Sequence, residues 1–171
     1  LVTSESWSNL TLNESFASYS EYLWREYKYG KLDADMHLFE ANQAYLNGQN
    51  TNKHLVRFNY ADKEDMFDAV SYNKGGAILH MLRNYLGDSA FFEGLKQYLT
   101  TYQYKSAEVH QLRLIFEEIT GKDLNWFFNQ WYYNSGHPKI DVSYDYNTIQ
   151  GKVTVNLLQL NSNEFAFPLA I

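Results

Sequence analysis

The sequence predicts a mainly α-helical fold, an antiparallel helical bundle followed by a short β-meander. Over most of the chain, apolar residues recur at three- and four-residue spacings, which place them on one face of a helix, and short connections separate these segments. After Gly136-His137-Pro138 apolar and polar residues alternate instead, which is typical of half-buried strands. We therefore expect two domains, residues 1–136 and residues 137–171, the second being the start of a β-sandwich.

The first helices are recognised by their apolar stripes and by the glycines that end them. One helix is expected from about Leu12 to Tyr29, where Gly30 stops it, and a second from about Ser71 to Leu86. The intervening residues 31–66 look less regular, and the polar residues around Asn47–Asn52 indicate a loop. The stripe of the first helix that we expect in the core is Phe16, Tyr19, Leu23 and Tyr27.

Three more helices and three strands are expected after Gly87. Ser89 and Ser106 have the side chains that open helices, Gly121 ends the second of these, and Asp123 caps a last helix. The predicted strands are 140–146, 153–157 and 165–171.

Composition and charge exclude several classes of function. The formal net charge is −6 and no run of Lys or Arg could follow a phosphate backbone, so nucleic acid is not an expected partner. No apolar stretch approaches the roughly 20 residues needed to span a membrane. The absence of Cys excludes disulfides, thiolate metal sites and Cys nucleophiles. Because the chain begins at Leu1 rather than at Met, we expect it to be part of a longer protein.

One face of the first helix combines carboxylates with small residues. Glu14 and Glu21 lie two turns apart, with only Ala17 and Ser18 between them on that face, so another helix could approach closely. Taken alone, a Glu at a helix start is more often a partner of the helix dipole than a functional group. A Tyr such as Tyr72 is likewise more often a core residue than a catalytic one.

Three motifs resemble the gluzincin aminopeptidases, the family of aminopeptidase N and leukotriene hydrolase. The first comprises Leu1-Val2-Thr3, Trp7, Leu12-Asn13-Glu14, Phe16-Ala17, Tyr19 and Glu21. The second is Phe67-Asp68-Ala69-Val70-Ser71-Tyr72-Asn73-Lys74-Gly75, and the third is Trp131 followed by Gly136-His137-Pro138. They occur in the order of the family and span most of the chain. Two positions depart from the family's pattern: Ser15 replaces the usual Gly and Thr11 the usual aromatic residue.

The resemblance implies a zinc aminopeptidase that acts on peptides with a free N-terminus. In the family an HExxH helix supplies two His ligands and the general base, and a downstream Glu is the third ligand; the matching residue here is Glu14. Tyr72 matches the residue that donates a hydrogen bond to the oxyanion, and Glu21 would orient a ligand His. The fold implied is the helical half of a thermolysin-like catalytic domain.

The HExxH helix is not in this sequence. The missing N-terminal part of the same protein is therefore an expected partner, and this fragment alone should be inactive and should not hold zinc tightly. An alternative stays open, in which the protein is a non-catalytic peptidase-like binding scaffold that has lost HExxH. Gly75 and Gly76 indicate close helix packing beneath the site. No further zinc ligand is expected among His37, His54, His80, His110 and His137.

Overall fold

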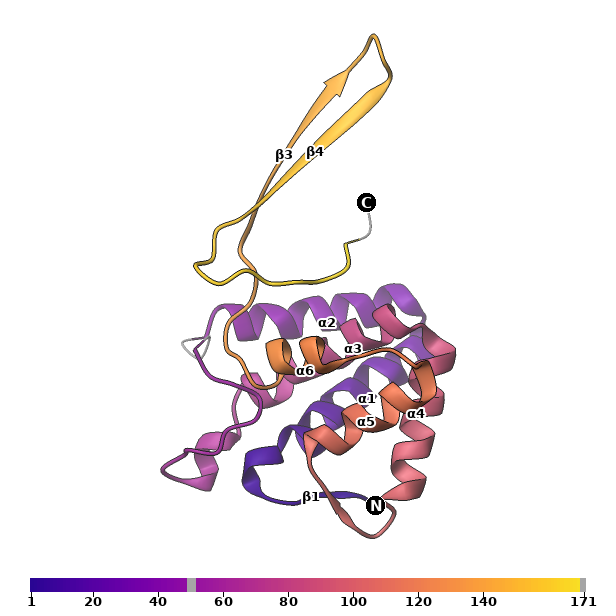
Figure 1. Ribbon diagram of the computed structural model, residues 1–171, viewed down its shortest axis with the longest axis vertical. Helices are drawn as coiled ribbons and strands as arrows, with labels where there is room; N and C mark the ends of the chain where they lie inside the picture. Colours follow the sequence, from indigo (N-terminus) through magenta and orange to yellow (C-terminus); the bar gives the residue numbers. More distant parts are fainter. Residues whose placement is uncertain (49–51, 170–171) are drawn as a thin grey trace. The chain divides into compact units, whose positions relative to one another are not determined.

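The computed structural model confirms a mainly helical fold that is followed by a pair of antiparallel strands (Figure 1). It describes residues 1–48 and 52–169, so the predicted loop around Asn47–Asn52 lies partly outside the described residues. The chain forms two compact units, Leu1–Ser135 and Gly136–Ile171. Within the described ranges, no helix is long and apolar enough to cross a membrane.

The helices of the first unit are α1 Thr11–Tyr29, α2 Lys31–Leu46, α3 Gly75–Leu86, α4 Asp88–Thr101, α5 Val109–Thr120 and α6 Asn125–Trp131, with 3-10 helices at Trp7–Asn9 and Lys63–Met66. Most connections between them are short, but a long one, which contains the 3-10 helix Lys63–Met66, links α2 to a π-helical turn, Val70–Lys74, that runs directly into α3. Helix α1 packs against α2 and α3, and α4 packs against α3 and α5.

The expectation that the residues after Gly30 are irregular is wrong, because Lys31–Leu46 forms helix α2. The segment contains neither Gly nor Pro, so nothing interrupts a helix. Its apolar residues do not share one face: Ala34 is buried, whereas Leu32 and Phe39 are exposed. The apolar residues of this segment therefore show only a weak helical periodicity in the sequence.

The buried face of α1 also differs from the predicted stripe. Tyr19 is buried as expected, but Tyr27 is 83% exposed and Tyr22 is buried in its place. The reason lies in the last turns of α1, where Glu26 pairs with Arg83 of α3 and so turns toward that helix. Tyr27 then points away from the core.

Several predicted element ends shift by a few residues. Ser106 does not open α5; Ser106–Ala107 (β2) instead pairs in parallel with Thr3–Ser4 (β1), and a capping box at Glu108 begins α5. Helix α4 begins at Asp88, directly after Gly87, rather than at Ser89. Asp123 is not the N-cap of α6, which is Leu124; it lies one residue earlier, where its Oδ1 accepts the backbone N–H of Asn125 at 2.8 Å.

A buried guanidinium joins three helices of the first unit. Arg83 of α3 donates through Nε and Nη2 to the two carboxylate oxygens of Asp88 at 2.8 and 2.9 Å, and through Nη1 to Glu26 of α1 at 2.7 Å. Bidentate pairs of this kind are among the stronger polar contacts in proteins. Tyr19 donates to or accepts from His80 Nδ1 at 3.1 Å beside them.

The second unit is a β-hairpin rather than the predicted three-stranded meander. Strand β3 (Ile140–Asn147) pairs antiparallel with β4 (Lys152–Gln159). The run from Phe165 forms no strand as far as residue 169, and residues 170–171 lie outside the described residues. One face of the hairpin carries three apolar cross-strand pairs, all solvent-exposed: Val142 with Leu157, Tyr144 with Val155, and Tyr146 with Val153.

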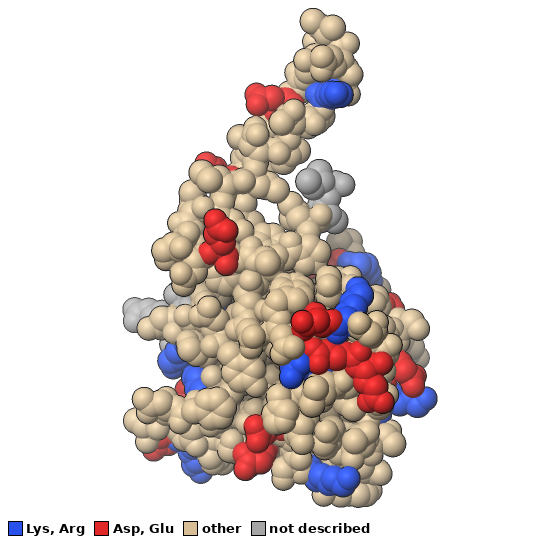
Figure 2. All heavy atoms as spheres, viewed as in Figure 1, with Lys and Arg blue, Asp and Glu red and all other residues tan. Residues whose placement is uncertain are grey.

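Charged side chains are interspersed on the surface of the first unit. On the face drawn in Figure 2, Lys and Arg lie among Asp and Glu over the helices, and the described residues of this face form no extended basic area.

Lys74 is the exception to the rule that buried charges are paired. It lies at the end of the π-helical turn, is 3% exposed, and its Nζ has no hydrogen-bond partner among the described residues. Burial, and then the charge of Arg57, lowers the pKa of Lys74 to about 8. Burying an unpaired ammonium group costs free energy, so Lys74 should destabilise the folded chain near neutral pH.

We expect Lys74→Met to raise the Tm of the chain at pH 7. Removing an unsatisfied buried charge should gain about 1–3 kcal/mol, or roughly 3–10 °C for a chain of this size. Since the folded-state pKa is lowered, the cost is fully present below about pH 8 and disappears as the pH rises toward the unfolded pKa of about 10.4. The Tm difference between variant and wild type should therefore shrink between pH 8 and pH 10 in thermal unfolding followed by circular dichroism.

Lys96→Met is the matched control, because the Lys96 side chain is 76% exposed. It should change the Tm by less than about 2 °C. A destabilising effect of Lys74→Met at pH 7 would mean that Lys74 has a stabilising partner.

Candidate functional site

Glu14 lies in the first turn of α1 and is half-buried. The start of the helix is anchored by buried Leu10 and Leu12, and by Asn13, whose Oδ1 accepts the backbone N–H of Ser4 at 3.0 Å. No cation among the described residues forms an ion pair with Glu14. Its carboxylate is therefore open to binding by an external cation on one side of the helix.

Tyr72 is carried by the π-helical turn, whose shape is fixed by the half-buried carboxylate of Asp68. Oδ1 of Asp68 accepts the backbone N–H groups of Val70 at 3.0 Å and Ser71 at 3.1 Å, and Arg57 donates to both Asp68 oxygens at 2.7 and 3.0 Å. Burial raises the pKa of Asp68, but hydrogen bonds from Arg57 and Lys53 outweigh it and hold this pKa below the usual range. Asp68 therefore stays ionised and keeps the turn in place.

Glu14 and Tyr72 lie near each other, although they come from different helical segments, because the residues beside them, Ser15 and Ser71, are joined by a hydrogen bond of 2.7 Å. Burial, followed by a hydrogen bond with Glu14 and the charge of Glu14, raises the pKa of Tyr72. The phenol therefore stays protonated at neutral pH and remains a hydrogen-bond donor beside a carboxylate.

The segment that carries Tyr72 approaches α1 very closely. A Cβ added at Gly75 would lie 1.8 Å from Ser15 Oγ, and one added at Gly76 would lie 3.4 Å from Ser18 Cβ. This confirms that the two glycines mark close helix packing. Ser18 is accordingly half-buried against Gly76, while Ala17, on the same face as Glu14, is exposed.

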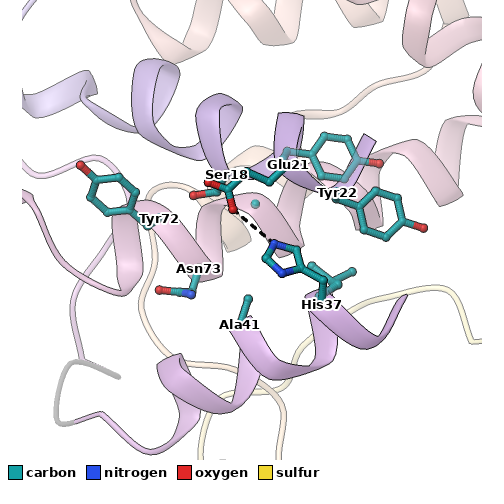
Figure 3. A pocket seen from close by; sticks show the side chains of 10 residues that line it. Ser18, Glu21, Tyr22, His37, Ala41, Tyr72 and Asn73 are labelled. Atoms are coloured by element: carbon teal, nitrogen blue, oxygen red, sulfur yellow. Dashed lines mark ion pairs between the residues drawn. The ribbon is translucent and has the colours of Figure 1, made fainter. Parts of the chain in front are cut away.

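Glu21 lies two turns along α1 and borders a hollow between α1, α2 and the π-helical turn (Figure 3). Its Oε2 is 3.3 Å from Nε2 of His37, which projects from α2. The rest of the lining is Ser18, Tyr19, Tyr22, Leu38, Ala41, Tyr72, Asn73 and Gly76. Glu21 and Tyr72 therefore line one hollow.

Sequence reasoning did not find His37 as a member of this site. Its neighbours in the hollow become apparent only once Lys31–Leu46 is known to be a helix beside α1. No motif spacing links His37 to Glu21, so the sequence carries no local signal for the pair.

The described residues do not gather three His, Cys, Asp or Glu side chains that could hold a metal ion. What they do combine is one carboxylate, Glu14, and one phenol donor, Tyr72, at a half-exposed position. Chemically, this pair could supply one oxygen ligand to a metal and one hydrogen bond to a developing negative charge.

Comparison with known proteins assigns these features to a family. Residues 1–131 match the Peptidase family M1 domain. The chain is 32% identical over 147 residues to Tricorn protease-interacting factor F2 of Thermoplasma acidophilum, covering 83% of this chain and 19% of that protein. It is 31% identical over 163 residues to Aminopeptidase 2, mitochondrial, of Saccharomyces cerevisiae (90% and 16%) and 32% identical over 151 residues to Aminopeptidase N of Lactococcus lactis (82% and 17%).

Two solved structures resemble the fold. Aminopeptidase A of Legionella pneumophila in complex with aspartic acid gives a TM-score of 0.74 at 20% identity, with 94% of this chain and 18% of that chain covered. The M1 zinc metallopeptidase of Deinococcus radiodurans gives a TM-score of 0.63 at 25% identity, with 78% and 29% covered.

The chain spans less than a fifth of the length of each of the three sequence relatives named above. Zinc is the cofactor named for the matching Deinococcus peptidase, and zinc is accordingly the cofactor of the family. Because the family match covers most of the chain, this chain belongs to peptidase family M1.

Proposed function

We propose that the chain is part of a zinc-dependent aminopeptidase, a hydrolase that removes residues from peptides with a free N-terminus. The observation that carries the proposal is that Glu14 and Tyr72 lie near each other on separate segments, because their neighbours Ser15 and Ser71 are hydrogen-bonded at 2.7 Å. Glu14 would bind the zinc ion and Tyr72 would stabilise the oxyanion of the tetrahedral intermediate. The names of the aminopeptidases among its relatives support this class of reaction.

Glu14 suits a zinc ion by its chemistry. Carboxylate oxygens are ordinary zinc ligands, and Glu14 is half-buried without a cationic partner among the described residues. Zinc, when bound, polarises the scissile carbonyl and acidifies a water molecule. Since the sequence contains no HExxH, the remaining ligands and the general base would come from residues outside this chain.

Tyr72 would act as a fixed hydrogen-bond donor. Because its pKa is raised, the hydroxyl keeps its proton at neutral pH and can donate to negative charge that develops on the substrate oxygen. A preorganised donor of this type contributes about 3 kcal/mol to transition-state stabilisation. Asp68 and Arg57 hold the turn on which this hydroxyl is mounted.

Glu21 would orient a zinc-ligating histidine of the HExxH helix. Exposed Ala17 leaves space on the α1 face between the two carboxylates, where a second helix could lie close. His37 engages Oε2 of Glu21, and no hydrogen bond to Oε1 is found among the described residues. That oxygen is free to accept the N–H of an imidazole, a contact typical of zinc-bound histidines.

We also propose that residues 1–136 belong to the catalytic domain and that residues 137–171 begin a β-sandwich. The exposed apolar face of the β3–β4 hairpin supports the second assignment, since a two-stranded hairpin is marginally stable unless such a face is covered. A second sheet is the usual cover in sandwich folds.

Glu14→Gln and Tyr72→Phe should fail in different ways in the full-length protein. Glu14→Gln removes an anionic ligand, so both zinc content and peptidase activity should fall. Tyr72→Phe should leave zinc bound while kcat falls by roughly 10²–10³, the usual effect of removing an oxyanion donor. Zinc is measured by atomic absorption after dialysis, and kcat with an aminoacyl-anilide substrate.

Tyr27→Phe is the matched control, because Tyr27 is on α1 and 83% exposed. It should leave kcat and zinc content unchanged. If Tyr72→Phe kept more than about a third of the wild-type kcat, Tyr72 would be a packing residue. If Glu14→Gln left zinc and structure unchanged in a protein without peptidase activity, the non-catalytic scaffold would be the better description.

The isolated chain should neither hold zinc tightly nor hydrolyse peptides. It supplies one family-type ligand, whereas a catalytic zinc site uses about three protein ligands. We expect less than about 0.1 zinc per chain after dialysis. Stoichiometric zinc that is lost on Glu14→Gln would contradict this expectation; zinc that is lost only on changing a surface His would not.

A further inference from the structure

Ser15, the residue after Glu14, makes a direct bond to the turn that carries Tyr72. Its Oγ donates to the backbone carbonyl of Ser71 at 2.7 Å, and Ser71 is the residue before Tyr72. Ser15 is 1% exposed, and its hydroxyl also shares a hydrogen bond with Thr11 Oγ1. One buried hydroxyl thus connects the neighbours of the two candidate site residues.

Gly75 faces Ser15 across the contact between the two segments. A Cβ at Gly75 would lie 1.8 Å from Ser15 Oγ and 2.6 Å from Ser15 Cβ, both shorter than real contacts. Ser15 therefore occupies the space that the missing side chain of Gly75 provides.

Ser71 is itself fixed from the other side, so the bond joins two rigid parts. Its N–H donates to Asp68 Oδ1 at 3.1 Å, its Oγ donates to Met66 O at 2.6 Å, and Arg57 Nη2 donates to that Oγ at 2.7 Å. Ser71 is fully buried. A movement of the turn relative to α1 would have to break the Ser15 bond or this network.

We propose that Ser15 is a positioning residue, whose bond to the Ser71 carbonyl holds the Tyr72 hydroxyl at a set place relative to Glu14. This inference rests on the proposed function, in which Tyr72 donates to the oxyanion. Donors of this kind must be placed within about 0.5 Å to be effective, and a displacement of about 1 Å can lower a rate by up to 10²-fold. Ser15 would contribute to the rate only through Tyr72.

The test compares Ser15→Ala with a matched serine in the full-length protein. We expect Ser15→Ala to lower kcat by about 10-fold, with KM within about twofold and zinc content unchanged. Ser20→Ala is the control, because Ser20 is exposed on the same helix and, among the described residues, its Oγ bonds only to Phe16 O. Ser20→Ala should leave kcat, KM, zinc content and Tm unchanged.

A double-mutant cycle separates positioning from a general structural effect. If Ser15 acts through Tyr72, Ser15→Ala should have less than about a twofold effect on kcat in the Tyr72→Phe background. An equal loss of kcat in both backgrounds, together with a lower zinc content, would overturn the inference in favour of a structural role. A kcat for Ser15→Ala within twofold of wild type would overturn it as well.

Further outcomes separate the inference about Ser15 from the proposed role of Tyr72. Should Ser15→Ala fail to fold, Ser15→Gly replaces it, since Gly is the residue in the family's pattern and removes the same hydroxyl. If Tyr72→Phe itself keeps the wild-type kcat, the proposed role of Tyr72 fails and the inference fails with it. If Tyr72→Phe lowers kcat as expected and neither Ser15 variant does, only the inference fails.

Discussion

The small, buried side chain of Ser15 and the missing side chain of Gly75 allow α1 and the turn that carries Tyr72 to pack closely. Ser15 Oγ bonds to Ser71 O at 2.7 Å in the space left by Gly75. Because this approach fixes α1 against α3, it also fixes which face of α1 carries Glu14 and which carries Tyr19 into the core. The contact between α1 and the Tyr72 turn therefore has two sides. The exposed side carries the candidate site, and the buried side is part of the core.

Polar groups are concentrated where the π-helical turn meets its neighbours. Asp68, Arg57 and Ser71 are hydrogen-bonded to one another, whereas Arg57 Nε and Lys74 Nζ are buried without a partner among the described residues. Buried polar groups without partners lower stability, and features of this kind occur mainly at functional sites, where geometry matters more than stability.

Much of the helical unit could be predicted from periodicity and glycine stops, as α1 and the end of α3 at Gly87 illustrate. Helix α2 could not, because apolar residues on both sides remove the single-face signal on which such predictions depend. The choice of Tyr22 over Tyr27 depends on the Glu26–Arg83 pair, a long-range contact that the local sequence does not contain. Glu14, Tyr72 and Glu21 were identified through motif resemblance, whereas His37 required the placement of α2 beside α1.

The π-helical turn changes the angle around the helix axis at which the residues of α3 point. In an α-helix each residue advances by about 100°, and a π turn accommodates one residue more than an α turn does. Here Lys74 N–H bonds to Ala69 O, five residues back, immediately before α3 begins. Residues on the two sides of this turn are thus offset by about 100° from an unbroken helix. Tyr72 therefore points at a different angle relative to the buried side chains Leu79 and Leu82 than it would in an unbroken α-helix.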